Sequence, residues 1–191
     1  MVRYQKGDAR AFEVLLVRHR KPVYNFIFRF VSDRAQAEDL LQETFLRVVR
    51  GAGTWKQGSK FTTWLYTIAR NQCVDLSRRM KLRRAQSLDA PVKAGETDGA
   101  ALMDMVADGG APVDRRAMGG ELQGRLKAAI AALSEEQREV FLMREILDMQ
   151  FGEIAEVTGV PENTVKSRMR YALEKLRDLL EDCEDMARVA P

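Results

Sequence analysis

The stretch FGEIAEVTGVPENTVKSRMRYALEKLR, residues 151–177, decides how the rest of the chain is interpreted. A short apolar pattern leads to Gly159 and Pro161, and a longer pattern with one apolar stripe and several cations follows. Glycine adopts the left-handed backbone of a tight turn without steric cost, and proline suits the first turn of a helix. The spacing therefore predicts a helix-turn-helix, although a plain helical hairpin would share much of the pattern.

Three residues give this prediction its specificity. Ala155 is small enough for two helices to approach, and Val160 and Val165 would fill the angle between them. The second helix would then point its amino end into the major groove of DNA, where Lys and Arg read guanine, Asn reads adenine and Glu reads cytosine. The candidates for base contacts are Glu162, Asn163, Lys166, Ser167 and Arg170, and those for phosphate contacts are Arg168, Tyr171 and Lys175.

The composition of the 191 residues fits a helix-rich globular protein, with 46% hydrophobic and 31% charged residues. The net charge of +3 says little about nucleic acids, but the basic run SRRMKLRR at 77–84 and the acidic tail show that charge is segregated. The two cysteines, Cys73 and Cys183, form no metal or disulfide pattern, so we expect reduced thiols and no metal or cofactor. No apolar run reaches the length of a membrane span and no signal core opens the chain, so we expect a cytoplasmic protein.

The fold class predicted is all-α, with two small helical domains joined by a flexible linker. Residues 1–84 form the first domain, 85–119 the linker, 120–186 the second domain and 187–191 a tail. The linker is rich in glycine and acidic residues, with room for a short helix near 100–106. In the first domain, His19 is expected in the core, Ser32 or Asp33 is expected to cap a helix, and Pro22 either bends a helix or starts the next one.

The segment AQAEDLLQETFLRVVR, residues 35–50, has two distinct helical faces. One carries core residues. The other carries Asp39, Gln42, Glu43 and Leu46 at i, i+3, i+4 and i+7. Leucine inside an acidic stripe suits contact with a basic partner helix. A merely solvated acidic face, with Phe45 in the core, is the alternative.

Four motifs in one order resemble the extracytoplasmic-function sigma factors of bacterial RNA polymerase, in the sigma-70 superfamily. They are GDARAFEVLLVRH, AEDLLQETFLRVVR, FTTWLYTIARNQCVDLSRR and EIAEVTGVPENTVKSRMRYALEKLR. The resemblance covers both domains, as sigma region 2 and region 4, and a lone helix-turn-helix would not give it. Similar proteins often have several more residues before GDARAF, which leaves open whether a short N-terminal piece precedes this chain.

The resemblance implies a role for each surface. Asp39, Gln42, Glu43 and Leu46, with Phe45 at the edge, would dock on core RNA polymerase. The second domain would read the minus-thirty-five promoter element, and the first would recognise and melt the minus-ten element. An anti-sigma factor would hold both domains until a signal releases the sigma factor. Because Asn163 stands where similar proteins frequently have glycine, no base preference is inferred.

Melting a duplex needs a pocket for an extruded base, stacking surfaces and cations for the exposed strand. The candidates at the minus-ten element are Lys60, Phe61, Thr62, Trp64, Asn71, Asp75, Arg78 and Arg79. Trp64 fits either a core position or a base-stacking one, and Asp75 could instead orient an arginine. The basic run from Arg78 to Arg84 fits contact with phosphates or a solvated helix end.

Two other function classes fit the sequence less well. A stand-alone DNA-binding regulator would share the helix-turn-helix, but that function would not explain the acidic face that contains Leu46. It would also require a receiver or ligand-binding domain, and the sequence shows no strand pattern for one. An enzyme is disfavoured because the sequence offers no paired carboxylates, metal-ligand cluster or phosphate loop.

Overall fold

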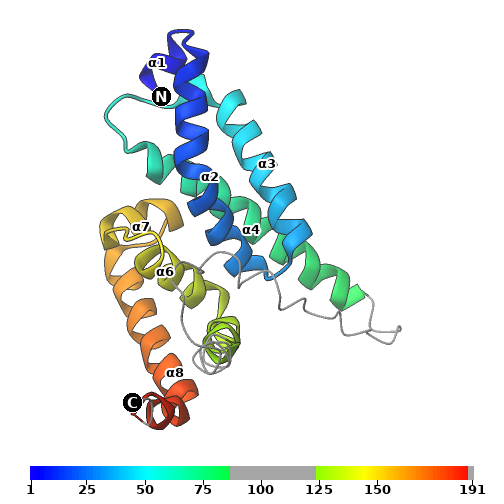
Figure 1. Cartoon of the computed structure of the whole chain (residues 1–191), viewed down its shortest axis with the longest axis vertical. Coiled ribbons are helices and arrows are strands. Elements are labelled where there is room, and N and C mark those ends of the chain that lie inside the picture. Colours follow the sequence, from blue (N-terminus) through cyan, green and yellow to red (C-terminus); the bar gives the residue numbers. More distant parts are fainter. Residues whose placement is uncertain (87–123, 189–191) are drawn as a thin grey trace, which may run out of the picture.

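The computed structural model describes residues 1–86 and 124–188, and every regular element within them is helical (Figure 1). The fold is therefore all-α, with two helical domains, as the sequence predicted. In the first domain the bounds are α1 Val2–Gln5, α2 Ala9–Val31, α3 Arg34–Arg50, the 3-10 turn η1 Ala52–Thr54 and α4 Phe61–Gln86. In the second they are a helical segment at 124–132, α6 Glu135–Glu145, α7 Phe151–Thr158 and α8 Glu162–Arg188.

Helix α2 is a single element that runs through Pro22, so no new helix starts there. Proline removes one backbone hydrogen bond from a helix interior. The turns on both sides of it nevertheless pack on one core, because Phe12 lies against that core and Val23 and Phe26 are fully buried. Tertiary packing of this stripe holds the helix together.

Short polar residues end α2 and begin α3. Ser32 takes the left-handed conformation, with φ of 57°, at the carboxyl end of α2. Asp33 is the N-cap of α3 and its Oδ1 accepts a hydrogen bond from the backbone N–H of Gln36 at 2.8 Å. This capping reverses the chain direction, so that α2 and α3 pack side by side and α4 completes the domain.

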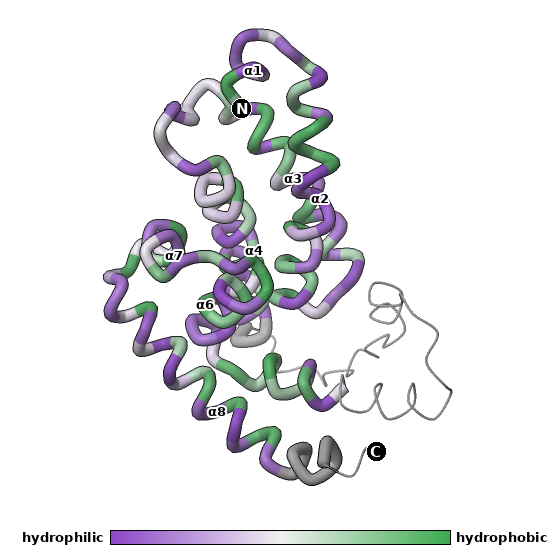
Figure 2. The backbone as a smooth tube through the Cα atoms, turned by 60° about the vertical axis from the view of Figure 1, so that its left-hand side comes forward, coloured by the Kyte–Doolittle hydropathy of each residue, from purple (hydrophilic) through white to green (hydrophobic). Residues whose placement is uncertain are grey.

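The second domain is built around a helix-turn-helix. Ser134 and Gln137 form the predicted capping box at the start of α6. Gly159 has φ of +72° and its N–H bonds to the carbonyl of Ala155 at 2.9 Å, which ends α7. Apolar and polar residues alternate along α8 (Figure 2), and the apolar ones, Val165 and Ala172 among them, are buried.

The two domains pack directly on each other. Helix α4 lies against α7, and α2 lies against α6. One continuous apolar cluster includes Phe26 and Val74 of the first domain and Leu142 and Ile154 of the second. The cation of Lys127 also lies over the ring of Phe28, 5.8 Å from its centroid.

Several predictions fall outside the described residues. The short helix near 100–106 and all but the first two residues of the predicted linker lie in 87–123. Helix α4 extends to Gln86, two residues past the predicted end of the first domain at 84.

Within the described part, no helix is long and apolar enough to cross a membrane, and no group of three or more potential metal ligands comes together there.

Candidate protein-binding and nucleic-acid-binding surfaces

The outer face of α3 combines polar residues with exposed apolar ones. Asp39 and Gln42 are exposed, and the side chain of Leu46 is 48% exposed. Val49, which sequence reasoning missed, is 40% exposed one turn farther on, and its spacing of three residues from Leu46 was the available signal. We call Asp39, Gln42, Leu46 and Val49 the α3 outer face.

Two other candidates on α3 lie beside this face. Glu43 is half-buried and pairs with Arg47 at 2.9 Å, and that hydrogen bond lowers the pKa of the Glu43 carboxyl. Phe45 is only 7% exposed and meets the edge of Phe12 at 6.5 Å between ring centroids. Phe45 therefore anchors α3 to the core and supports the face from behind.

The first turns of α4 bring an aromatic group together. The ring of Phe61 lies 5.4 Å from His19 and 6.1 Å from Trp64, between ring centroids. Trp64 is half-buried against the core, and a Cβ added to Gly51 would lie 3.3 Å from its ring. His19 is half-buried here, and burial lowers the pKa of its imidazole.

Lys60 and Thr62 flank Phe61. Thr62 is half-buried, whereas Lys60 is exposed and its Nζ lies 2.6 Å from Oε1 of Glu153 on α7. That ion pair crosses from the first domain to the second. It lowers the pKa of the Glu153 carboxyl.

Farther along α4, four candidates line exposed positions. Asn71, Asp75, Arg78 and Arg79 all face solvent. The sequence allowed the Asp75 carboxylate to orient an arginine. In the structure the Nε of Arg79 donates instead to the backbone carbonyl of Asp75 at 3.3 Å, so the Asp75 carboxylate takes no part in that hydrogen bond. Asn71 accepts a hydrogen bond from Nη1 of Arg70 at 3.3 Å.

The helix-turn-helix has the geometry predicted for it. Val165 is fully buried, and Val160 and Ala155 pack partly buried against the same core. Pro161 precedes α8, and its carbonyl accepts the backbone N–H groups of Thr164 at 2.9 Å and Val165 at 3.1 Å. The first turns of α8 are thereby fixed relative to α7.

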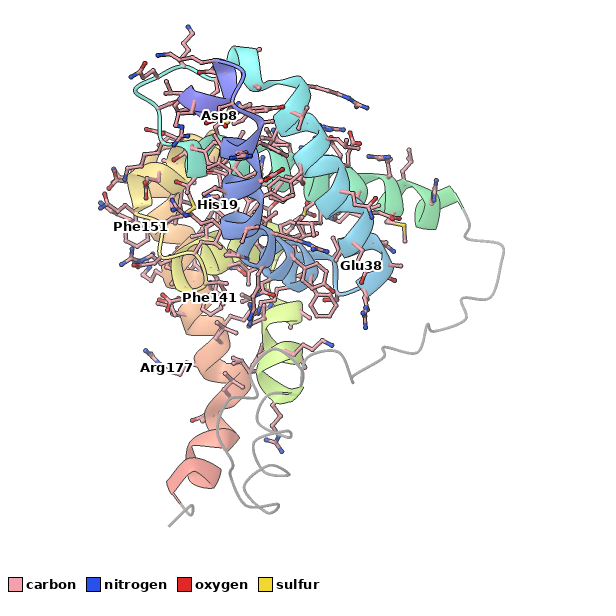
Figure 3. All side chains as sticks on the ribbon, turned by 45° about the horizontal axis from the view of Figure 1, so that its top comes forward. Asp8, His19, Glu38, Phe141, Phe151 and Arg177 are labelled. Atoms are coloured by element: carbon pink, nitrogen blue, oxygen red, sulfur yellow. The ribbon has the colours of Figure 1, made fainter. Side chains whose placement is uncertain are left out.

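Six candidates on α8 are exposed and share its outer side, and several contact one another. Lys166 pairs with Glu162 at 2.6 Å. The guanidinium of Arg170 lies over the ring of Tyr171, 4.9 Å from its centroid. Arg177, farther along α8, also points away from the rest of the chain (Figure 3). The six are Glu162, Asn163, Lys166, Ser167, Arg170 and Tyr171.

Two predicted phosphate-binding residues of α8 instead contact protein groups. Nη1 of Arg168 lies 3.5 Å from Oε1 of Glu139, with a quarter of its side chain exposed. Nζ of Lys175 donates to the backbone carbonyl of Ala132 at 2.7 Å, at the end of the helical segment at 124–132. Both predicted phosphate ligands therefore already have protein partners in the structure.

Glu139 of α6 is a buried carboxylate that sequence reasoning missed. It is 1% exposed and accepts hydrogen bonds from Nε and Nη2 of Arg70 at 2.7 and 3.2 Å. Burial raises the pKa of the Glu139 carboxyl, although the charges of Arg70 and Arg168 oppose that change. Its only sequence signal was an acidic residue at an inward position of α6.

Comparison with known proteins accounts for both domains. Residues 15–84 match the family Sigma-70 region 2, and residues 123–176 match Sigma-70 region 4. The chain is 34% identical over 184 residues to the RNA polymerase sigma factor CarQ of Myxococcus xanthus, covering 96% of this chain and 97% of that protein. It is also 33% identical over 178 residues to the extracytoplasmic-function (ECF) sigma factor SigW of Bacillus subtilis, covering 93% of each. The chain belongs to the ECF sigma factors.

Solved structures give the same fold. The sigma factor RpoE of Bartonella quintana, determined with the anti-sigma factor NepR, matches with a TM-score of 0.71 and 24% identity. The match covers 91% of this chain and 98% of that one. CnrH, determined with the cytosolic domain of CnrY, matches with a TM-score of 0.67 and 22% identity, covering 93% and 92%. At these identities the likeness is evidence of fold alone, and it spans both domains.

Proposed function

We propose that this ECF sigma factor binds core RNA polymerase and directs initiation at particular promoters. In this proposal the first domain docks on polymerase and recognises and melts the minus-ten element, and α8 reads the minus-thirty-five element. The observation that carries it is the presence, in one chain, of an apolar and acidic face on α3 and a basic, polar helix-turn-helix face on α8.

The α3 outer face is suited to a protein partner. Leu46 and Val49 are both at least 40% exposed, next to the acidic and amide groups of Asp39 and Gln42. An exposed apolar pair rimmed by polar groups is typical of protein interaction sites. The acidic residues would steer the face toward a basic helix of the polymerase.

The exposed positions of α4 are suited to the opened minus-ten strand. Arg78 and Arg79 would hold phosphates, and Asn71 and Asp75 would hydrogen-bond base edges. At the start of the helix, Lys60 would hold a phosphate and Phe61 and Thr62 would line the site. Trp64, half-buried on Gly51, leaves only part of its ring for stacking on a base.

The outer side of α8 is suited to duplex DNA. Lys166 and Arg170 can donate to guanine, Asn163 to adenine, and Glu162 can accept from cytosine. The pair between Glu162 and Lys166 must exchange partners when DNA binds, because each group would then face a base. Ser167 and Tyr171 would add contacts at the edge, and phosphate contacts of Arg168 and Lys175 would require those side chains to leave their present partners.

The role proposed is one of binding without chemistry of its own. The family is one of transcription initiation factors, and we infer that the chain needs no cofactor and catalyses no reaction. Its partners would be core polymerase, promoter DNA and an anti-sigma factor. Because it works with RNA polymerase, we place it in the cytoplasm.

Run-off transcription with purified core polymerase and a library of promoters tests the proposal. Core polymerase without a sigma factor does not start at defined positions. We expect the chain to produce discrete starts, and Asn71→Ala or Lys166→Ala to shift or abolish them. The absence of any start, together with duplex binding by the chain alone, would favour a stand-alone regulator.

A further inference from the structure

Helix α1 lies against η1, the short turn that leads from α3 toward α4 (Figure 1). Gln5, the last residue of α1, makes the polar contact between them. Its Nε2 donates to the backbone carbonyl of Ala52 at 2.8 Å and to that of Trp55 at 2.8 Å. Because carbonyls only accept hydrogen bonds, both contacts use the NH2 group of the amide, which has a hydrogen for each. One side chain therefore links α1 to a segment 47 to 50 positions away.

The rest of α1 is anchored to α2. The ring of Tyr4 lies 5.0 Å from that of Phe12, between ring centroids. Arg3 pairs at 2.7 Å with Asp8, which is the N-cap of α2. These contacts hold α1 in place on the first domain, so the amide of Gln5 reaches η1 from a fixed support.

The turn that Gln5 holds lies against Trp64, one of the candidate residues for the minus-ten element. A Cβ added to Gly51, directly before η1, would lie 3.3 Å from Cζ2 of the Trp64 ring. Oγ1 of Thr54 donates to the carbonyl of Gly51 at 2.7 Å, which closes the turn. Because Trp64 is half-buried, the position of η1 decides which part of its ring is covered.

The remainder of the loop is shaped by its own residues. Oγ of Ser59 donates to the carbonyl of Lys56 at 2.9 Å, and Gly58 between them has φ of +113°. Glycine takes this backbone conformation without steric cost. Gln5 thus fixes the part of the loop beside Trp64, and the part that leads to Lys60 is held by local contacts.

We propose that Gln5 is a positioning residue of the minus-ten site: by holding η1 against the ring of Trp64, it fixes the surface that Trp64 offers to the unpaired strand. This inference rests on the proposed function. Without the two hydrogen bonds, η1 would shift and the indole would take several orientations. A stacking surface that must be ordered on binding costs entropy, so opening of the duplex would become less favourable. Gln5 acts through Trp64 and does not itself touch DNA.

Fluorescence of Trp64 reports this contact in the free chain. The chain has two tryptophans, so Trp55→Phe leaves Trp64 as the only one. The indole N–H of Trp55 is buried and has no hydrogen-bond partner among the described residues, so this replacement breaks no side-chain hydrogen bond. The backbone carbonyl that Gln5 contacts is retained. Quenching of Trp64 emission by acrylamide then measures how well η1 covers the ring.

Two variants remove the donors of Gln5 in different ways. Gln5→Glu keeps the shape of the side chain but offers no N–H group, and Gln5→Met has a similar length and adds no charge. We expect both to raise the quenching constant of Trp64 about twofold, because both lose the two hydrogen bonds to the loop. An unchanged constant in both variants, with thermal melts that show them folded, would overturn the proposal.

A rescue variant and a matched control separate the contact from a general disturbance of α1. Gln5→Lys carries N–H donors on a slightly longer side chain and should recover most of the wild-type constant. Lys6→Gln, at the exposed neighbouring position, makes the same change in charge as Gln5→Glu and should leave the constant unchanged. A rise with Lys6→Gln as large as with Gln5→Glu would contradict the proposal.

Run-off transcription with core polymerase tests whether the positioned ring serves melting. One promoter template is fully paired, and a second carries mismatched, unpaired bases at the minus-ten element. We expect Gln5→Met to reduce starts about fivefold on the paired template and less than about twofold on the mismatched one, where the strands are already open. Equal losses on both templates would overturn the proposal, because a general defect affects both alike. A wild-type chain that gives no discrete start on either template would instead contradict the proposed function, whatever the quenching of Trp64 shows.

Discussion

The outer faces of α3 and α8 are both exposed, yet they differ in kind. On α3, Leu46 and Val49 stand among acidic and amide groups. On α8, Lys166 and Arg170 stand beside carboxylates that partly neutralise them, since Lys166 pairs with Glu162 at 2.6 Å and Arg170 with Glu174 at 3.8 Å. The first face can gain by burying apolar area, and the second by exchanging its internal partners for bases and phosphates.

This difference shows how a single small chain can address two kinds of macromolecule. Apolar burial in a protein interface is not weakened by rising salt, although the acidic residues beside it are screened, whereas phosphate contacts release counterions and weaken steeply as salt rises. The two faces should therefore respond differently to substitution and to ionic strength.

The largest effect is expected from Leu46→Asp. A charge in the middle of the α3 outer face should weaken binding to core polymerase about thirtyfold or more, the effect of losing a central hot spot. Fluorescence titration of labelled protein with core polymerase measures it. Val17→Asp is the matched control, because Val17 is 80% exposed on α2, outside that face. Equal losses in both variants would contradict the assignment.

Lys166→Ala should act on DNA and spare the polymerase. We expect about tenfold weaker binding to a duplex that carries the minus-thirty-five element, within the range for one base contact. If Lys166 binds a phosphate instead, the loss should be the same for every sequence and the salt slope should fall by about one. Lys21→Ala, in the other domain, should change neither. Anisotropy titrations at several salt concentrations separate these results.

Gly159→Ala should destabilise the turn that supports the α8 face. With φ of +72°, an alanine there costs about 1–2 kcal/mol of unfolding free energy. Gly152→Ala is the opposite case, because it lies inside α7 and should stabilise the helix by up to about 1 kcal/mol. Thermal melts of the two variants should move in opposite directions. A shift of both in the same direction would show that the turn does not constrain α8.

Val49→Ala should have the smallest effect. Val49 is 40% exposed at the edge of the α3 outer face, so its truncation should weaken polymerase binding about two- to threefold. The same titration as for Leu46 measures it. A loss as large as that of Leu46→Asp would place the centre of the interface nearer the carboxyl end of α3.

The parts of the fold that depend on neighbours in sequence were predictable. Gly159 ends α7 in the left-handed conformation only three residues before α8 begins, and glycine is the residue that takes this conformation without steric cost. Ser134 with Gln137 forms a capping box, which is a local signal of a helix start. The apolar repeat of α8 marked its buried side at Val165. Each of these signals lies within one or two helical turns.

The parts that depend on distant segments were not predictable. Arg168 and Lys175 carry the same charge as Lys166, and only the fold shows that Glu139 and the carbonyl of Ala132 receive them. Arg70 meets Glu139 across 69 positions, and no spacing rule relates them. The sequence left two possibilities at Pro22, a bend within one helix or the start of a second helix. It could not decide between them because the apolar stripe that holds α2 together packs on the core of the whole domain.

Permanganate footprinting of a promoter tests the central claim most directly, because it detects unpaired thymines. With core polymerase and this chain together, we predict reactive thymines at the minus-ten element. Core polymerase alone, the chain alone, and core polymerase with the Leu46→Asp variant should show none. Reactive thymines with the chain alone, or none when the chain and core polymerase are both present on a promoter they bind, would contradict the account.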